Sequence, residues 1–154
     1  MASGFTDIPF HIDWCQWLER RVWALQRHMC KGKIHRATVT QAELDYVGSI
    51  TIDSLLLKAA DIKPYEIVQI TSLRNATRWK TYALPAPEGT GKICLNGPPA
   101  HLFSPGDIVI ILSMGMYDES EVDNLVPKVV FVDEKNQITK IEEHHLITNG
   151  ETSP

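Results

Sequence analysis

The dipeptide Gly48-Ser49, within the stretch DYVGSITID (45–53), joins two residue types that together can break a peptide bond. Glycine leaves the carbonyl carbon sterically open and tolerates backbone torsions that other residues avoid. A serine hydroxyl directly after this carbonyl can attack it and convert the amide to an ester. Elimination to dehydroalanine and hydrolysis would then leave a pyruvoyl group on the new N-terminus. Because Gly-Ser is also a common turn, the dipeptide alone leaves both interpretations open.

Two further patterns have chemical potential but carry little weight. The segment EGTGK (88–92) resembles a phosphate-binding loop, yet its glycine spacing is wrong and a strand, not a helix, is expected to follow. Ser49, His35 and Asp53 can be combined into a triad on paper, as almost any chain of this size allows. We therefore interpret the first pattern as a hairpin loop and assign the second no role.

The histidines and cysteines follow no ligand spacing. His35 and His101 are isolated, and the pair His144-His145 follows two glutamates in a polar segment typical of a solvated surface. We predict no metal site. The cysteines match no zinc or redox motif, which favours reduced thiols in a cytoplasmic protein; they are Cys15, Cys30 and Cys94.

The composition is that of an ordinary globular chain of 154 residues, with 44% hydrophobic and 22% charged residues. A net charge of -4 and no basic run argue against a nucleic-acid partner. No apolar stretch is long enough to span a membrane, and the N-terminus lacks the apolar core of a secretory signal. Its arginines leave a mitochondrial transit peptide open, but its acidic residues argue against one. We expect a cytoplasmic location and no membrane partner.

The first predicted element is an amphipathic helix from Asp13 to about Met29. Its apolar residues recur at helical spacing and make one stripe, formed by Trp14, Trp17, Leu18, Val22 and Leu25. We expect the stripe to dock on the protein's own domain or on a sister subunit. A helix that binds a membrane surface or another protein is the alternative, and the mixed charge of the polar face weakens the membrane case.

The remainder of the chain predicts short β-strands joined by turns. A hairpin is expected around residues 74–77, a short helix capped by Asp53 or Ser54 up to Ala60, and a short helix or loop at 117–126. This pattern indicates a small barrel or sandwich. The strands are expected at 33–40, 49–53, 66–73, 78–84, 92–97, 107–115 and 128–136.

Four separated segments, in order, resemble the bacterial aspartate 1-decarboxylase family, whose members use a pyruvoyl group to make β-alanine for pantothenate and coenzyme A. They are KIHRATVTQAELDYVGSITID (33–53), RWKTYAL (78–84), GKICLNGPPAHLFSPGDIVIIL (91–112) and PKVVFVDEKN (127–136). The resemblance implies a mainly β fold, a small double-psi β-barrel with short helices, usually assembled as a homotetramer with sites between subunits. The added N-terminal amphipathic helix would belong to an extension, 1–24, ahead of a self-processing domain, 25–141, and a polar tail, 142–154.

The resemblance also implies roles for individual residues. Cleavage between Gly48 and Ser49 would convert Ser49 to the pyruvoyl cofactor, and Tyr82 matches the family's proton donor. Thr81 matches a residue that helps both cleavage and binding of L-aspartate. Other residues match processing or substrate-binding positions, namely Lys33, His35, Tyr46, Arg78, Asn96, Gly97, Pro98 and Pro99.

The expected chemistry needs an electron sink for the electrons that a departing carboxylate leaves behind, and a protein-bound ketone is one. Aspartate has a second carboxylate, which Arg78 or Lys33 could hold. Tight pairing of a cation with the departing carboxylate would stabilise the ground state. We therefore assign at least one of these cations to the side-chain carboxylate, and the sequence leaves open which one.

One segment departs from the family pattern. The family usually has Asn-Gly-Ala-Ala-Ala where this chain has Asn96-Gly97-Pro98-Pro99-Ala100. Proline has no backbone N–H to offer a substrate carboxylate. The proline pair therefore leaves open a pyruvoyl decarboxylase for another acidic amino acid. An unprocessed barrel that serves as a binding or scaffold protein is a further alternative, and the presence of Ser49, Thr81 and Tyr82 together argues against it.

Overall fold

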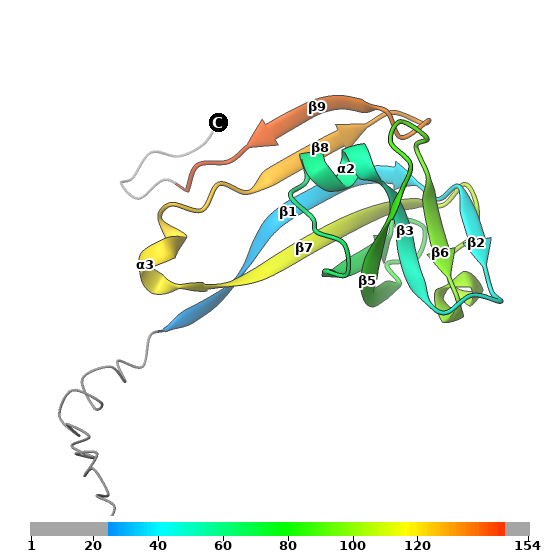
Figure 1. Ribbon diagram of the computed structural model, residues 1–154, viewed down its shortest axis with the longest axis horizontal. Helices are drawn as coiled ribbons and strands as arrows, with labels where there is room; N and C mark the ends of the chain where they lie inside the picture. The colour runs from blue at the N-terminus through cyan, green and yellow to red at the C-terminus, as the bar shows by residue number, and fades with distance from the viewer. Residues whose placement is uncertain (1–24, 147–154) are drawn as a thin grey trace, which may run out of the picture.

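The computed structural model describes residues 25–146, and within them the chain is mainly β-strand (Figure 1). Most of the predicted N-terminal helix lies outside the described residues. The elements, in order, are β1 (Gln26–Thr38), β2 (Gln41–Glu43), β3 (Ser49–Asp53), α2 (Ser54–Ala59), β4 (Ile67–Ser72), β5 (Arg78–Ala86), β6 (Ile93–Asn96), the 3-10 helix η1 (Pro98–His101), β7 (Ile108–Asp118), α3 (Glu119–Val122), β8 (Lys128–Val132) and β9 (Ile138–Glu143).

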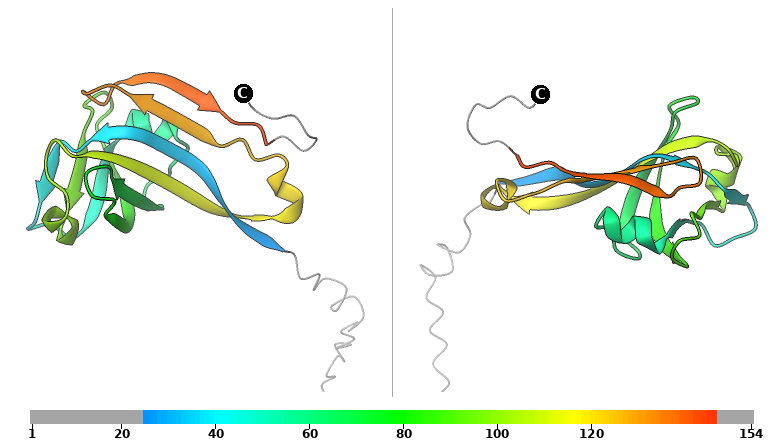
Figure 2. Two further views of the ribbon diagram at one scale, coloured as in Figure 1. Left: turned by 180° about the vertical axis from the view of Figure 1, so that it is seen from behind. Right: turned by 90° about the horizontal axis from the view of Figure 1, so that it is seen from above.

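The strands form one nine-stranded sheet in the order β2-β6-β3-β5-β4-β7-β1-β8-β9. Figures 1 and 2 show β2, β6, β3 and β5 turned across one end of the long strands β1 and β7, so that the sheet curls around the core. The β3–β5 and β1–β8 pairs are parallel, which brings together segments far apart in the chain. The prediction of a mainly β fold built as a small barrel is confirmed.

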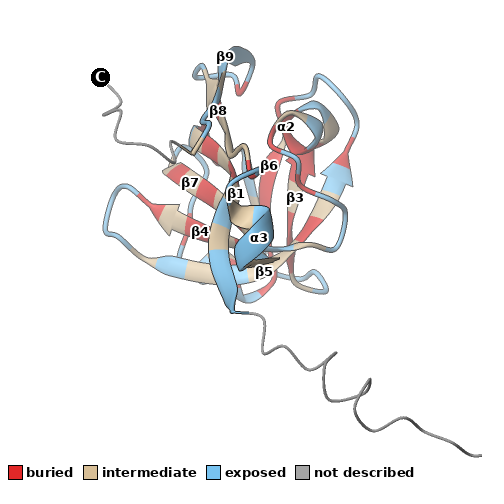
Figure 3. Ribbon diagram, turned by 90° about the vertical axis from the view of Figure 1, so that its left-hand side faces the viewer, coloured by how far each residue is buried: buried red, intermediate tan, exposed pale blue. Residues whose placement is uncertain are grey.

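The core forms where strands of the curled sheet face one another (Figure 3). Alternate residues of β4 and β7 point inward, as the period of a strand requires. Strand β6 is buried along its whole length, and β3 is buried except at Thr51, so both strands have covered faces. The fully buried aliphatic residues of these four strands include Ile50, Ile52, Val68, Ile70, Ile93, Leu95, Val109 and Ile111.

The N-terminal end of β1 corrects one prediction. The apolar stripe predicts a helix to about Met29, whereas Gln26–Met29 belong to β1 and pair with β7 in register from Gln26↔Asp118 to Met29↔Gly115. Pairing with a long antiparallel partner supplies backbone hydrogen bonds that helical spacing in one segment cannot reveal. In Figure 1 this part of the β1–β7 pair extends beyond the barrel, with α3 at its far end.

Other predicted elements are confirmed with shifted boundaries. β4 and β5 form the expected antiparallel hairpin, and Asn75 Oδ1 accepts from the backbone N–H of Thr77 at 3.0 Å within its turn. The strand predicted to run through residue 136 ends at Val132 instead, because Asn136 adopts a φ of 59° in a turn. The chain then returns as β9, which reaches Glu143, so the first two residues of the predicted polar tail are strand.

Candidate active site

The Gly48-Ser49 peptide lies where an exposed loop enters strand β3. Gly48 has a φ of 66° and Ser49 a φ of 157°, so both residues of the bond have positive φ. The backbone N–H of Gly48 donates to Tyr46 O at 2.7 Å, which closes a tight turn around Val47. A non-glycine residue in such a conformation costs about 1–3 kcal/mol. Cleavage between the two residues would release this strain.

Ser49 is fully buried and faces polar side chains of β6. In the antiparallel β3–β6 pair, Ser49 lies opposite Asn96 and Thr51 lies opposite Cys94, and alternation along each strand puts all four side chains on one face. Asn96 Nδ2 donates to Ser49 Oγ and to Thr51 Oγ1, both at 2.8 Å. The Cys94 thiol donates to Asn96 Oδ1 at 3.1 Å. We call these four residues the Asn96 cluster.

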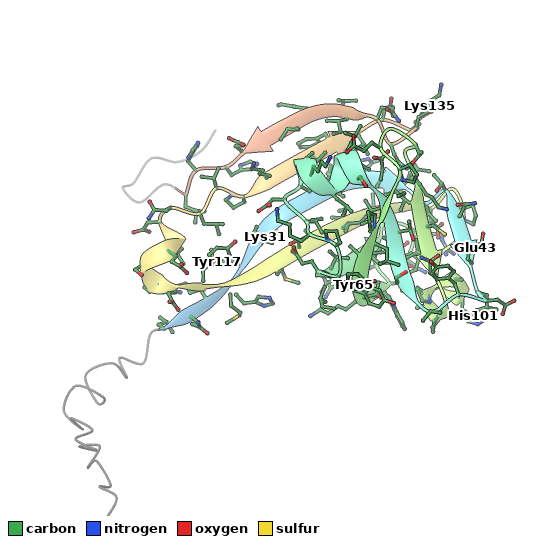
Figure 4. The ribbon with its side chains drawn as sticks, in the orientation of Figure 1. Lys31, Glu43, Tyr65, His101, Tyr117 and Lys135 are labelled. Atoms are coloured by element: carbon green, nitrogen blue, oxygen red, sulfur yellow. The ribbon has the colours of Figure 1, made fainter. Side chains whose placement is uncertain are left out.

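Gly97 holds the loop that carries Gly48 against β6. Its N–H donates to Glu43 O at 2.7 Å, and its φ is 74°. A Cβ at Gly97 would lie 2.9 Å from Gly48 Cα and 3.0 Å from Tyr46 O, closer than real Cβ contacts. Figure 4 shows Glu43 and His101, of β2 and η1, at this same end of the molecule. Only glycine at position 97 allows the loop to approach so closely.

Tyr82 reaches the same loop from β5. Its hydroxyl donates to Val47 O at 3.3 Å, and the parallel β3–β5 pairing places the neighbouring Ala83 opposite Ile50. The ring of Tyr65, labelled in Figure 4, stacks on that of Tyr82 with centroids 5.6 Å apart and planes 12° apart. The phenol is therefore held beside the residues that precede the Gly48-Ser49 bond.

The remaining candidates on β5 lie beside Tyr82 along the strand. Thr81 is half-buried and pairs with Val68 of β4, and no side-chain hydrogen bond is found for it within residues 25–146. Arg78 is exposed at the start of β5 and shares the face of Tyr82, about 13 Å along the strand at ~3.3 Å per residue. The Arg78 side chain makes no ion pair within the described part of the chain.

The candidates on β1 are not in contact with Ser49. In the sheet order, β7 and β4 separate β1 from β5, and no hydrogen bond or ion pair links Lys33 or His35 to the Asn96 cluster among the described residues. Tyr46 does lie in the loop before Gly48, but 53% of it is exposed. A single chain therefore assembles the bond and its neighbours without Lys33 and His35.

His35 occupies an apolar setting at an irregular point of β1. Its ring meets Phe131 edge-on at 5.3 Å, and its buried Nδ1 has no hydrogen-bond partner within residues 25–146. Burial lowers the pKa of His35 below its usual 6.5, and the charges of Lys33 and Arg36 lower it further. The imidazole is thus favoured in its neutral form at neutral pH.

Pro98 and Pro99 are the first two residues of η1, directly after Gly97. Proline suits the start of a helix because the N–H groups there have no partner within the helix. Pro99 is buried and its carbonyl accepts from the N–H groups of Leu102 and Phe103 at 2.9 and 3.0 Å. The proline pair therefore fits the fold while removing two N–H groups next to Gly97.

The buried Asp53 carboxylate accepts several backbone hydrogen bonds, of which the sequence predicted only the helix cap. The sequence left Asp53 and Ser54 as candidate caps of α2, and the structure shows Asp53 in that role, since its Oδ1 accepts from Leu55 N at 2.8 Å. The same carboxylate also accepts from Gly89 N at 3.1 Å and Gly91 N at 2.7 Å. The EGTGK loop therefore gives these N–H groups to a carboxylate and is not a phosphate cradle. The Ser49-His35-Asp53 triad considered from the sequence does not form.

Asn136 and Cys94 have structural contacts that the sequence analysis missed. The Asn136 side chain accepts from Thr38 N at 2.7 Å and donates to Thr38 O at 2.8 Å and Gly91 O at 2.7 Å, which ties β1 to the loop before β6. Cys94 completes the Asn96 cluster. The partners of Asn136 are far away in sequence. Cys94 contacts Asn96 two residues along β6, and only the β3–β6 pairing brings this pair next to Ser49.

Within the described residues no group of three or more histidine, cysteine, aspartate or glutamate side chains is arranged to hold a metal ion. His144 Nε2 lies 3.5 Å from Glu142 Oε2 at the surface. No helix in this same part of the chain is both long and apolar enough to cross a membrane.

Comparison with known proteins identifies the family. Residues 25–139 match the family model described as aspartate decarboxylase. The chain is 52% identical over 115 residues to an aspartate 1-decarboxylase of Moorella thermoacetica, covering 75% of this chain and 90% of that protein. It is 55% identical over 119 residues to that of Acetivibrio thermocellus, covering 76% and 94%. The resemblance seen in the sequence is thus confirmed, and the chain belongs to the aspartate decarboxylase family.

Proposed function

We propose that this protein decarboxylates L-aspartate to β-alanine and CO2, in the cytoplasm and for pantothenate and coenzyme A synthesis, after cutting its own chain between Gly48 and Ser49. Membership of the family supports the reaction. The observation that carries the proposal is the buried Ser49 hydroxyl, held at 2.8 Å by Asn96 next to a bond whose two residues both have positive φ.

Self-cleavage would begin when Ser49 Oγ attacks the Gly48 carbonyl carbon. A C–O bond forms, the C–N bond breaks, and the hydroxyl proton moves to the Ser49 nitrogen. Loss of the Ser49 α-proton then expels the Gly48 carboxylate, and hydrolysis releases ammonia and leaves a pyruvoyl group. The surroundings of Ser49 fit a pyruvoyl group. The position is buried, and Asn96 Nδ2 is a hydrogen-bond donor that a pyruvoyl oxygen could accept from.

A pyruvoyl carbonyl supplies the electron sink that decarboxylation of an amino acid requires. The chain's own residues do the rest. The Tyr82 phenol, held beside the loop by Val47 O, would give its proton to the substrate carbon that loses its carboxylate. Thr81 and Gly97 would help to bind the substrate beside it. Arg78 or Lys33 would hold the second carboxylate, which separates aspartate from uncharged amino acids.

We also propose that the enzyme is a homotetramer with its sites between subunits. Lys33 and His35 lie on a strand apart from Ser49, so a neighbouring copy is a natural source of these side chains. Several large apolar residues are also exposed near the cleavage loop, and another copy of the chain would cover them. These residues include Tyr46 at 53%, Ile67 at 58%, Tyr65 at 72% and Val47 at 90%. Residues 1–24 would be an extension of this family domain, whose match begins at residue 25.

Intact-mass spectrometry of the purified protein tests the proposal. We expect two fragments, residues 1–48 and 49–154, the larger one lighter by one ammonia than a chain that starts with serine. Ser49→Ala should stay whole and form no β-alanine from aspartate. A parent chain that stays whole under every condition would contradict the proposal and would favour the unprocessed scaffold.

The proline pair favours one second candidate, a pyruvoyl decarboxylase for another acidic amino acid. Pro98 and Pro99 change the N–H groups next to Gly97, where the family binds its substrate. Product analysis of the cleaved enzyme with aspartate and with glutamate separates the two. Faster turnover of glutamate would replace aspartate as the substrate and leave the cofactor chemistry intact.

A further inference from the structure

The Asn96 cluster places a thiol, an amide and two hydroxyls on one face of the β3–β6 pair. Cys94 and Asn96 are two residues apart on β6, and Ser49 and Thr51 are two apart on β3. On the opposite face of the same strands lie fully buried isoleucine and leucine side chains. The cluster is thus a closed polar set, and each contact in it constrains the others.

The amide of Asn96 could meet Ser49 in two orientations, and they differ in their chemical effect. With Nδ2 toward Ser49, the amide donates to Oγ and favours the charge that develops there as the hydroxyl loses its proton. With Oδ1 toward Ser49, the amide would accept the hydroxyl proton and hold it on the nucleophile. The first orientation is the one in the structure.

We propose that Cys94 is a positioning residue for self-cleavage: its thiol occupies Asn96 Oδ1 at 3.1 Å and so directs Nδ2 to Ser49 Oγ. This role rests on the proposed function. In the same orientation, the Thr51 hydroxyl takes the second N–H of Nδ2 at 2.8 Å. An amide turned around would face two hydroxyls with its oxygen and leave its NH2 group against a thiol, a weak acceptor.

The thiol suits this task because it is 1% exposed and keeps its proton. Burial raises the pKa of Cys94 above the usual 9.0, so the group stays an S–H donor at neutral pH. In the step it serves, the Ser49 Oγ to Gly48 carbon bond forms, the Gly48 carbon to Ser49 nitrogen bond breaks, and the proton passes from oxygen to nitrogen. Cys94 touches none of these atoms and acts only through Asn96.

The test follows cleavage of freshly purified whole chains by intact mass, in the parent, Cys94→Ala and Cys94→Ser. Alanine removes the donor, whereas serine keeps one. We expect Cys94→Ala to cleave about three- to tenfold more slowly, as loss of one modest hydrogen bond predicts, and Cys94→Ser to recover most of the rate. Cys30→Ala is the matched control, since Cys30 is exposed and, within residues 25–146, its thiol hydrogen-bonds only Gly32 O; it should cleave at the parental rate.

Stability is measured separately by placing Cys94→Ala and Cys94→Ser in the uncleavable Ser49→Ala chain. A slow Cys94→Ala with rescue by Cys94→Ser supports the positioning role. Equal cleavage rates in all chains would overturn it. So would slow cleavage in both variants that follows a lowered melting temperature, since that marks packing alone. A parent that never cleaves refutes the proposed function itself, whereas a parent and Cys94→Ala that cleave equally refute only the role of Cys94.

Discussion

The backbones of Gly97, which directly precedes η1, and Gly48 lie against each other, although the two residues are far apart in the sequence. A Cβ at Gly97 would lie 2.9 Å from Gly48 Cα and 3.0 Å from Gly48 N. Gly97 therefore sets the position of the bond that the protein is proposed to cut. Position 97 requires glycine for two reasons: its φ is 74°, and the backbone of the loop that carries Gly48 fills the space where a Cβ would lie.

Replacement of Gly97 by alanine should slow self-cleavage about ten- to a hundredfold, because the new Cβ displaces the Gly48 carbonyl from the Ser49 hydroxyl. Gly89→Ala is the matched control, since Gly89 has a φ of 75° but nothing within 4 Å of its Cβ position. Both variants should lose about 1–3 kcal/mol of stability from the positive φ, and Gly97→Ala should lose more because its Cβ meets the Gly48 backbone. Intact mass over time measures cleavage, and equal rates in the two variants would show that contact with the loop is irrelevant.

Tyr82→Phe should separate cleavage from turnover. The variant keeps the ring stacked on Tyr65 and loses the hydroxyl that donates to Val47 O, so we expect cleavage within a few-fold of the parent. Formation of β-alanine should fall about 10²- to 10⁴-fold, the usual contribution of a positioned acid. Tyr65→Phe, which removes a hydroxyl from the neighbouring ring, is the control. Near-normal turnover by cleaved Tyr82→Phe would take the donor role away from Tyr82.

The sequence could predict those parts of the site that depend on local residue types. Gly48-Ser49 and the run from Asn96 to Pro99 each lie in one short segment, so their chemistry was visible before the fold. The hydrogen bond between Asn96 and Ser49 was not, because 47 residues separate them and only the β3–β6 register brings them opposite. The link of Cys94 to the site was missed for the same reason, since Cys94 hydrogen-bonds its near neighbour Asn96 and reaches Ser49 only through the Asn96–Ser49 contact.

The same limit explains the errors in the fold. The helix predicted from the apolar stripe extends to about Met29, and the assignment of Gln26–Met29 to β1 depends on their pairing with β7. Strand β9 pairs with β8 and is mostly exposed, so it has no strong hydrophobic alternation to predict it. Local patterns identified the class of fold. Pairing across the sheet decided where β1 begins, and it formed β9, which no local pattern predicted.

His35 should make the fold less stable in mild acid. Its folded pKa is lowered, so between that value and the unfolded 6.5 the unfolded chain binds a proton that the folded chain does not. Stability is therefore greatest above pH 6.5 and falls as the pH decreases. In the single-chain Ser49→Ala background, urea unfolding at pH 5.5 and 7.5 should show a smaller difference for His35→Gln. An unchanged difference would mean that other groups set this pH dependence.

The proline pair should weaken the handling of aspartate. Pro98 and Pro99 open η1 without the two N–H groups that an alanine pair would present beside Gly97, and the next N–H, that of Ala100, already donates to Gly97 O at 2.9 Å. Each lost hydrogen bond to a charged group costs about 1.5–3 kcal/mol, roughly ten- to a hundredfold in binding. The rigid turn offsets part of this loss by holding the pocket in one shape.

We therefore expect Pro98→Ala/Pro99→Ala to raise kcat/KM for aspartate. The higher kcat/KM should come mainly from a lower KM, because N–H groups that bind a carboxylate stabilise the bound substrate and the transition state alike. Both proteins must be fully cleaved, as judged by intact mass, before kinetics are compared. Pro105→Ala, a substitution in the exposed turn before β7, controls for the general effect of removing a proline. A fall in kcat/KM would show that the prolines shape a working pocket, and glutamate would then be the substrate to test first.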